Sequence, residues 1–201
     1  PARFGRDARW PPEFREFRMT ESQEPIRQID INIAPSFHND LSESWIYTVV
    51  EAGLEVAVAP DEDCQVSLLV TGDATVRQLN HRFRGLDEVT DVLSFSSSHD
   101  GHWEGEVPES RNGQPDSGDF PFVLPPGELP PLGEVVISFP QAQRQALQRS
   151  QPVDQEMALL IVHGILHLVG HDHVEQEDTA RMQAREQAAL ASVFQIGAAN
   201  T

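Results

Sequence analysis

The chain has 201 residues, of which 39% are hydrophobic and 23% are charged, as in an ordinary folded domain with a core. This composition excludes a fibrous, collagen-like or wholly disordered chain. The 14 basic residues are all arginine and face 32 acidic ones, so a formal net charge of -18 repels nucleic-acid backbones and anionic lipid over most of the surface.

A single cysteine, Cys64, excludes an internal disulfide and a zinc site built from several cysteines. No stretch approaches the roughly 20 apolar residues of a membrane span, and none has the pattern of a signal peptide. We therefore expect a cytoplasmic protein that does not bind membranes. Residues 1–25 show no repeating apolar face, and we expect them to form a disordered leader.

The first half of the chain has the pattern of alternating strands and helices. Residues 29–33 alternate isoleucine with polar residues, which predicts a half-buried strand. Apolar residues at helical spacing then predict a helix over 41–52, capped by Asn39 or Asp40 and stopped by Gly53.

A second strand and a second helix follow. The strand is predicted over residues 65–71, and the helix over 73–83, with its end at Gly85. A further β-type run covers residues 89–96. The apolar face of the predicted helix is formed by Val76, Leu79 and Phe83.

The amino-acid composition changes in residues 96–131. This stretch holds seven Pro, five Gly and seven acidic residues against one arginine, Arg111, which gives it a net charge of -6. A segment so poor in core-forming residues does not fold by itself. We therefore interpret it as a long acidic loop inserted into the domain.

The remainder of the chain is mostly helical. Residues 135–139 predict a strand, and helices are predicted over 141–149, 153–169 and 175–194. Strands and helices alternate first and helices then dominate, which predicts an α+β fold with one small mixed β-sheet packed against several α-helices. We expect a single domain over residues 26–196.

The most informative stretch is His163-Gly-Ile-Leu-His167-Leu-Val-Gly170-His171-Asp172-His173. Residues four apart on a helix share a face, so His163 and His167 can bind one ion. On the same straight helix His171 would lie about 12 Å along the axis from His163, and His173 would point away. A left-handed turn at Gly170 would bring His173 to the ion and leave a fourth position open, as in catalytic zinc sites.

Other interpretations of this stretch are weaker. Four histidines within eleven residues are unlike one packed core histidine, because each would need its own buried hydrogen-bond partner. Gly164 stands where the familiar metalloprotease pattern has its Glu general base. A deaminase needs a paired-cysteine motif that one cysteine cannot supply. The pattern therefore disfavours both a protease and a deaminase.

The segment from His163 to His173 resembles the H-G-x-L-H-L-x-G-[YH]-D-H signature of the YbeY family, the bacterial rRNA-maturation endoribonucleases. Two further blocks are similar to family motifs: LNHRFRGLDEVTDVLSF at residues 79–95 and LGEVVIS at residues 132–138. The resemblance covers roughly residues 29–194 and places the acidic loop where two core strands of the family are joined. It implies a YbeY-like domain with a zincin-like metal-binding helix.

The resemblance also implies a site. It assigns one zinc ion to His163, His167 and His173, and it makes Arg84 the catalytic residue beside the metal. The chemistry agrees, since a divalent ion lowers the pKa of water and an arginine fork holds phosphate oxygens. Two alternatives stay open: an arginine at a helix end is often only a solvated cap, and three imidazoles also accept nickel, copper or iron.

Around this site the chain both follows and departs from the family. The resemblance places His171 in the cleft, and Asp172 either orients a ligand imidazole or caps the next helix. Leu86 stands where the family has Lys, and Glu88-Val89 replaces its x-Pro. One positive charge is lost at the RNA-facing rim, and the acidic loop repels phosphate as well. We therefore expect weak binding to free RNA and placement by the ribosome or a protein partner.

The resemblance implies a single-strand-specific, metal-dependent endoribonuclease that matures the 3′ end of 16S rRNA and acts in ribosome quality control. Its implied partners are single-stranded ribosomal RNA, the small ribosomal subunit, a ribosomal protein and an Era-type GTPase. The nucleophile is open, since either water at the metal or the 2′-hydroxyl would cleave the bond. The alternative function is an assembly factor that binds ribosomal protein and GTPase with a mainly structural zinc site. A hydrolase of a small substrate is permitted but has no positive support.

Overall fold

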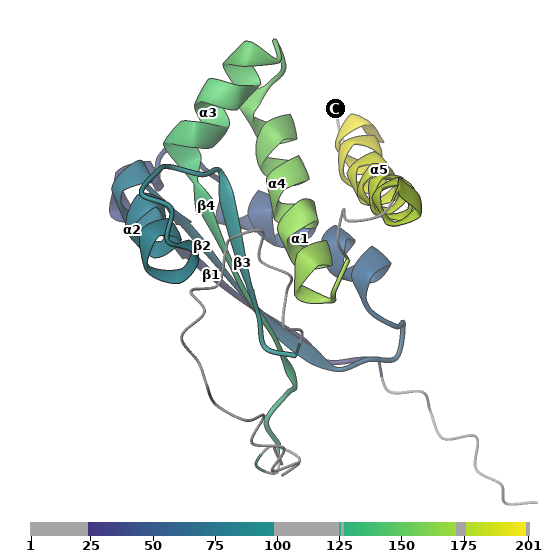
Figure 1. Ribbon diagram of the computed structural model, residues 1–201. Helices are drawn as coiled ribbons and strands as arrows, with labels where there is room; N and C mark the ends of the chain where they lie inside the picture. Colours follow the sequence, from purple (N-terminus) through teal and green to yellow (C-terminus); the bar gives the residue numbers. More distant parts are fainter. Residues whose placement is uncertain (1–23, 99–124, 126, 172–175, 200–201) are drawn as a thin grey trace, which may run out of the picture.

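The computed structural model describes residues 24–98, 125, 127–171 and 176–199 (Figure 1). Within these residues the elements follow one another as β1 (Arg27–Ile33), η2 (Pro35–Phe37), α1 (Glu43–Ala57), β2 (Cys64–Thr71), α2 (Asp73–Arg84), β3 (Val92–Ser96), β4 (Pro131–Ser138), α3 (Phe139–Gln148), α4 (Val153–Leu168) and α5 (Gln176–Ala199). The predicted order of strands and helices is confirmed. The predicted leader and most of the acidic loop lie outside the described residues.

The strands of the described chain form one mixed sheet in the order β1-β2-β4-β3. β1 runs parallel to β2, and β2 runs parallel to β4 with Leu68 opposite Val135, whereas β3 is antiparallel to β4. The predicted α+β fold with a mixed sheet is thus confirmed. The acidic segment joins two neighbouring strands, β3 and β4, and β3 forms an edge of the sheet.

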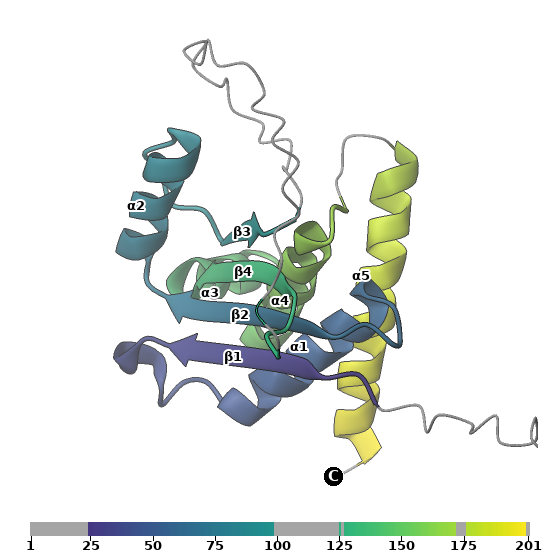
Figure 2. The ribbon, with the colours of Figure 1, turned by 90° about the horizontal axis from the view of Figure 1, so that it is seen from below.

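Helices cover the two faces of this sheet unequally (Figures 1 and 2). α1 and α4 lie on one face with α5 packed on their outer side, and α2 lies on the other face. The buried strand residues of the large core face α1 and α4: Cys64, Val66, Leu68, Val70, Val135 and Ile137. The small core under α2 is formed by Val76, Leu93 and Val136, with Leu69, Leu79 and Phe95 packed against it. No helix among the described residues is long and apolar enough to cross a bilayer.

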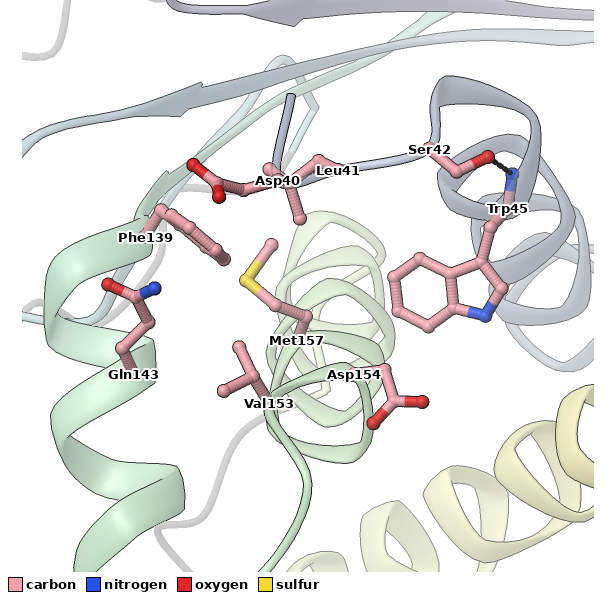
Figure 3. Close-up of a pocket in the computed structure, with 9 residues that line it drawn as sticks. All are labelled: Asp40, Leu41, Ser42, Trp45, Phe139, Gln143, Val153, Asp154 and Met157. Carbon is pink, nitrogen blue, oxygen red and sulfur yellow. Dashed lines mark hydrogen bonds between the residues drawn. The ribbon is translucent and has the colours of Figure 1, made fainter. Parts of the chain in front are cut away.

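The first predicted helix is present as α1, but its predicted cap is wrong. Ser42, rather than Asn39 or Asp40, precedes the helix with extended backbone. Its hydroxyl accepts a hydrogen bond from the backbone amide of Trp45 at 3.3 Å (Figure 3). The cap lies later than predicted because the serine satisfies a first-turn amide, whereas the apolar pattern begins before the helix does.

The predicted stop of this helix at Gly53 is also wrong, because α1 continues through Gly53 to Ala57. A Cβ at Gly53 would lie only 2.8 Å from Ile165 Cδ1 on α4. The glycine therefore allows two helices to approach closely instead of ending one of them. This packing requirement depends on a residue more than 100 positions away, so the local sequence pattern could not predict it.

Boundaries shift around the second half of the sheet. β3 starts three residues later than predicted, at Val92, and β4 starts four residues earlier, at Pro131. Buried Phe139 begins α3 with Ser138 as its N-cap, instead of ending the strand. An apolar run that passes from a strand directly into a helix does not mark the boundary between them.

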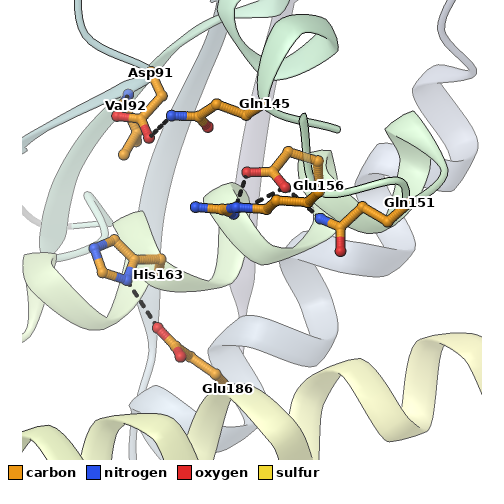
Figure 4. A network of polar contacts seen from close by, with 8 residues as sticks. Asp91, Val92, Gln145, Gln151, Glu156, His163 and Glu186 are labelled. Carbon is orange, nitrogen blue, oxygen red and sulfur yellow. Dashed lines mark hydrogen bonds and ion pairs between the residues drawn. The ribbon is translucent and has the colours of Figure 1, made fainter. Parts of the chain in front are cut away.

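A buried carboxylate fixes the start of α4. Glu156 is fully buried and accepts hydrogen bonds from Arg149 Nη1 at 2.7 Å and from the side-chain amide of Gln151 (Figure 4). The helix has no side-chain cap at Pro152. Because a buried carboxylate without partners would be strongly destabilising, this cluster ties the turn after α3 to the first turn of α4.

Candidate metal centre

The last turns of α4 lie close against the sheet. A Cβ at Gly164 would lie 2.6 Å from Val135 Cγ1, so a larger residue does not fit without movement. The hydroxyl of Ser94 on β3 donates to the carbonyl of Gly164 at 3.1 Å, and that of Ser96 donates to the carbonyl of Leu168 at 2.7 Å. These contacts attach the C-terminal half of α4 to the edge strand and give the neighbouring histidines defined positions.

His163 and His167 face each other on this part of α4. Their Nε2 atoms are 3.1 Å apart, and their ring centroids are 4.6 Å apart at an interplanar angle of 73°. Two nitrogens bound about 2.0–2.1 Å from one tetrahedral ion are about 3.3–3.4 Å apart. The pair therefore has nearly the spacing that two imidazole ligands of one ion require, and such nitrogens suit zinc, nickel, copper or iron.

A carboxylate on α5 orients the first imidazole (Figure 4). Glu186 Oε1 lies 2.8 Å from His163 Nδ1, and the Glu186 side chain is only 13% exposed. When Nδ1 carries the proton and donates it to the carboxylate, Nε2 keeps its lone pair on the side of His167. The contact therefore favours the tautomer in which His163 can act as a metal ligand.

The turn predicted at Gly170 is confirmed. α4 ends at Leu168, Gly170 has a φ of 83°, and the amide of His171 donates to the carbonyl of Leu166 at 3.1 Å. A left-handed glycine in this position ends a helix and changes the direction of the chain. His171 follows it and is half-buried; burial, and next the charge of Arg185, lowers the pKa of its imidazole.

The structure brings together two of the three predicted ligands. The third, His173, and its neighbour Asp172 lie outside the described residues. Within the described residues, no group of three or more His, Cys, Asp or Glu side chains is arranged to hold a metal ion. The complete ligand set and the zincin-like character of α4 thus stay predictions.

Arg84 belongs to the helix that lies on the opposite face of the sheet from α4. It is the last residue of α2 and half-buried, and Gly85 follows it with a φ of 72°, so the predicted helix end is confirmed. α2 and α4 pack against β3 from opposite faces. Arg77 binds both oxygens of Asp87 at 2.7 and 2.8 Å, which fixes the loop after α2 and lowers the pKa of that carboxyl.

A separate hollow lies at the other end of α4 (Figure 3). It has a volume of about 380 Å³ and is lined by Asp40, Leu41, Ser42, Trp45, Phe139, Gln143, Val153, Asp154 and Met157. Asp154 and His163 are nine residues apart on α4, which is about 14 Å along the helix axis. The hollow contains no histidine and is not part of the candidate metal centre.

Sequence reasoning missed Glu186. Its position carries a signal, because it continues the buried stripe of Met182, Ala189 and Val193 on α5 at spacings of three and four residues. A carboxylate in an inward-facing stripe needs a partner. That partner, His163, lies 23 residues earlier on another helix, so only the tertiary structure identifies it.

Comparison with known proteins gives a consistent result. The sequence profile of a family described as Endoribonuclease YbeY matches residues 28–193. Proteins named Endoribonuclease YbeY from Dehalococcoides mccartyi and Heliobacterium modesticaldum are 36% and 37% identical; the matches cover 84% and 75% of this chain and 91% and 84% of those proteins. A solution structure from Thermotoga maritima matches the fold with a TM-score of 0.54 at 20% identity, covering 86% of this chain and 93% of that one.

Proposed function

Because the chain belongs to the YbeY endoribonuclease family, we propose that it hydrolyses phosphodiester bonds in single-stranded ribosomal RNA. In the cell we assign it to the cytoplasm, to maturation of the 3′ end of 16S rRNA and to ribosome quality control. The family supports the class of reaction, and the paired histidines of α4 support the place where it occurs.

The observation that carries this proposal is the 3.1 Å separation of His163 Nε2 and His167 Nε2, with Glu186 on the opposite nitrogen of His163. We assign His163, His167 and His173 as the ligands of one zinc ion, and the turn at Gly170 supports a return of the chain toward the pair. When bound, the ion supplies a Lewis acid that offsets charge on the phosphoryl group and lowers the pKa of nearby water.

The other assigned residues act on the substrate or on the ligands. Arg84 binds phosphate oxygens, because its planar guanidinium can donate two parallel hydrogen bonds. Its half-buried position at the rigid end of α2 limits the conformations of the side chain. His171 lines the cleft, and Asp172 contacts a ligand imidazole or caps α5.

Two substitutions test these roles. His167→Ala is expected to lose both the metal and cleavage, whereas Arg84→Glu is expected to lose cleavage and keep the metal. The measurements are metal analysis of the purified proteins and cleavage of a ribosomal RNA precursor. His38→Ala, which removes an exposed histidine, is the matched control and should change neither. Cleavage by metal-free protein at the rate of the loaded protein would contradict the assignment.

An assembly factor is the second candidate function. It would bind the small ribosomal subunit through a ribosomal protein and an Era-type GTPase, with zinc serving mainly the fold. The formal net charge of -18 favours this candidate, because it attracts basic ribosomal proteins. Complementation separates the two functions: an assembly factor carrying Arg84→Glu restores growth to cells that lack the protein, and a nuclease with this change does not.

A further inference from the structure

The last turn of α2 leaves an aromatic ring uncovered. Val76, Leu79 and Phe83 lie on one face of the helix at spacings of three and four residues. Val76 is fully buried and Leu79 packs against the small core, but Phe83 is 54% exposed. The ribbon of α2 extends past β3, one of the two edge strands of the described sheet (Figure 2).

One neighbour holds this ring in place. The centroids of Phe83 and Phe95 are 5.1 Å apart at an interplanar angle of 66°, an edge-to-face contact. The exposed Arg82 places its guanidinium carbon over this ring, 5.3 Å from the centroid of Phe83, so a group that stacks on Phe83 would use the part of the ring that Arg82 leaves exposed. Among the described residues, the ion pairs do not include Arg82, so its charge is not paired with a carboxylate of that part of the chain.

The end of α2 is unusual for the exposure of its apolar residues. The large exposed apolar side chains of the described residues are Ile26, Tyr47, Phe83, Leu86 and Leu147. Phe83 and Leu86 are three residues apart and flank Arg84, the residue assigned to phosphate. Two exposed apolar side chains within four residues of each other, beside an arginine, make this end of α2 a candidate binding surface.

Charge on this face selects the kind of group that it accepts. Glu134 on β4 lies opposite Phe95 in the register of the two strands, so both side chains are on the α2 face. Glu134 is exposed, and its carboxylate repels phosphate. An uncharged planar group therefore suits the surface of Phe83, and phosphate suits the arginines on either side of it, Arg82 and Arg84.

We propose that the exposed part of the Phe83 ring stacks against one base of the single-stranded RNA, with the Arg82 guanidinium on a neighbouring phosphate. This inference rests on the proposed function. Ser94 and Ser96 flank Phe95 in β3 and bind carbonyls of α4, so the ring and the paired imidazoles lie on opposite sides of one strand. An RNA that crosses this edge passes both. Stacking requires an unpaired base, so the contact selects single-stranded RNA.

The test measures RNA binding by fluorescence anisotropy at low salt, with a labelled single-stranded RNA of about twelve nucleotides. Phe83→Ala is expected to weaken binding about tenfold, as loss of one stacked base does. Phe83→Leu keeps an apolar contact with Phe95 but has no aromatic face, and it should lose about as much. Phe83→Trp should bind at least as well as the unchanged protein.

The matched control is Tyr47→Ala, which removes another exposed aromatic side chain, 41% exposed, from α1 in the layer on the opposite face. It should leave binding unchanged. A second series places one abasic nucleotide at each position of the RNA in turn. One position should weaken binding to the unchanged protein about tenfold and have no further effect on Phe83→Ala, because the same contact is already lost.

Three results would overturn the inference. In the first, Phe83→Leu binds RNA with the affinity of the unchanged protein, and in the second, the unchanged protein binds no RNA. In the third, every abasic position weakens binding to Phe83→Ala by the same factor as it weakens binding to the unchanged protein. Failure of the proposed function gives a different result. If the Phe83 variants weaken binding as expected while the unchanged, metal-loaded protein does not cleave ribosomal RNA precursors, stacking is supported and the nuclease assignment is not. If instead the unchanged protein cleaves ribosomal RNA precursors and the Phe83 variants bind RNA as well as it does, the nuclease assignment is supported and stacking is not.

Discussion

The two faces of the sheet differ in how they are covered, and the difference separates stability from chemistry. Under α1 and α4, Val135 and Ile137 are fully buried, and α5 adds a further layer. On the α2 face Phe95 is half-buried and Glu134 is exposed. The first face therefore supplies most of the hydrophobic stabilisation, and the second leaves aromatic and charged groups accessible to a ligand. The edge strand β3 contacts helices on both faces and connects the two.

A series of leucine substitutions tests this difference most directly. Leu166→Ala on α4 removes a fully buried side chain from the large core and is expected to destabilise the protein by about 2–5 kcal/mol. Leu79→Ala in the small core should cost about 1 kcal/mol, because that side chain is only partly buried. Leu147→Ala, at 81% exposure, is the control and should change the free energy of unfolding by less than about 0.5 kcal/mol.

Urea unfolding measures the three values. Equal losses for Leu166→Ala and Leu79→Ala would show that the α2 face contributes as much to stability as the face under α1 and α4, and the contrast between the faces would then be wrong.

Glycine substitutions compare close packing with backbone conformation. Gly164→Ala places a Cβ 2.6 Å from Val135 Cγ1, and we expect a loss of about 1–3 kcal/mol although alanine favours helix. Gly85→Ala meets no atom within 4 Å but keeps a φ of 72°, so its loss of about 1–2 kcal/mol arises from the backbone alone. Val135→Ala, which is itself destabilising, should cost less in the Gly164→Ala variant than in the unchanged protein and equally much in the Gly85→Ala variant; thermal unfolding of the single and double variants measures this difference.

Removal of Glu186 tests whether the layer formed by α5 also supports the candidate metal centre. Glu186→Ala takes away the carboxylate 2.8 Å from His163 Nδ1, and zinc affinity should fall about 10–100-fold because the imidazole loses its orientation. A competition titration with a chelator of known affinity gives the value. Glu177→Ala, an exposed acid on the same helix, is the control. Equal zinc affinity in both variants would remove Glu186 from the site.

The smallest expected effect concerns the attachment of α2 to α3. The hydrogen bond from the Arg144 guanidinium, and then that from the Ser138 hydroxyl, lowers the pKa of Asp73, while burial opposes the shift. The charged form stabilises the folded state, so this contribution is present above the unfolded pKa of about 3.9 and is lost as the pH falls through the lower folded value.

Asp73→Asn should therefore be less stable than the unchanged protein at pH 7, by less than about 1 kcal/mol because Arg144 is half exposed, and equally stable in strong acid. Urea unfolding at several pH values measures the difference. A difference that persists below the folded pKa would show that the asparagine itself, rather than the lost charge, destabilises the protein.

Elements whose pattern is set by their own residues were predictable. β2 and α2 differ from the prediction by one residue each, because strict alternation marks the strand and Gly85 marks the helix end. The predicted helix end at Gly53 was wrong for the opposite reason. Gly53 makes room for Ile165 of another helix, and the local sequence does not distinguish such a glycine from one that ends a helix. The exposure of Phe83 could not be predicted either. Helical spacing places it on the apolar face of α2, but this spacing does not indicate where the sheet that covers that face ends.

Local spacing alone specifies the order of strands and helices, the shared face of His163 and His167, and the turn at Gly170, because each depends on helix or strand geometry and on the backbone freedom of one glycine. The strand order β1-β2-β4-β3, the contact of Glu186 with His163 and the exposure of Phe83 were decided only by the tertiary structure. Each of these depends on packing between segments far apart in the chain, and no local periodicity encodes such contacts.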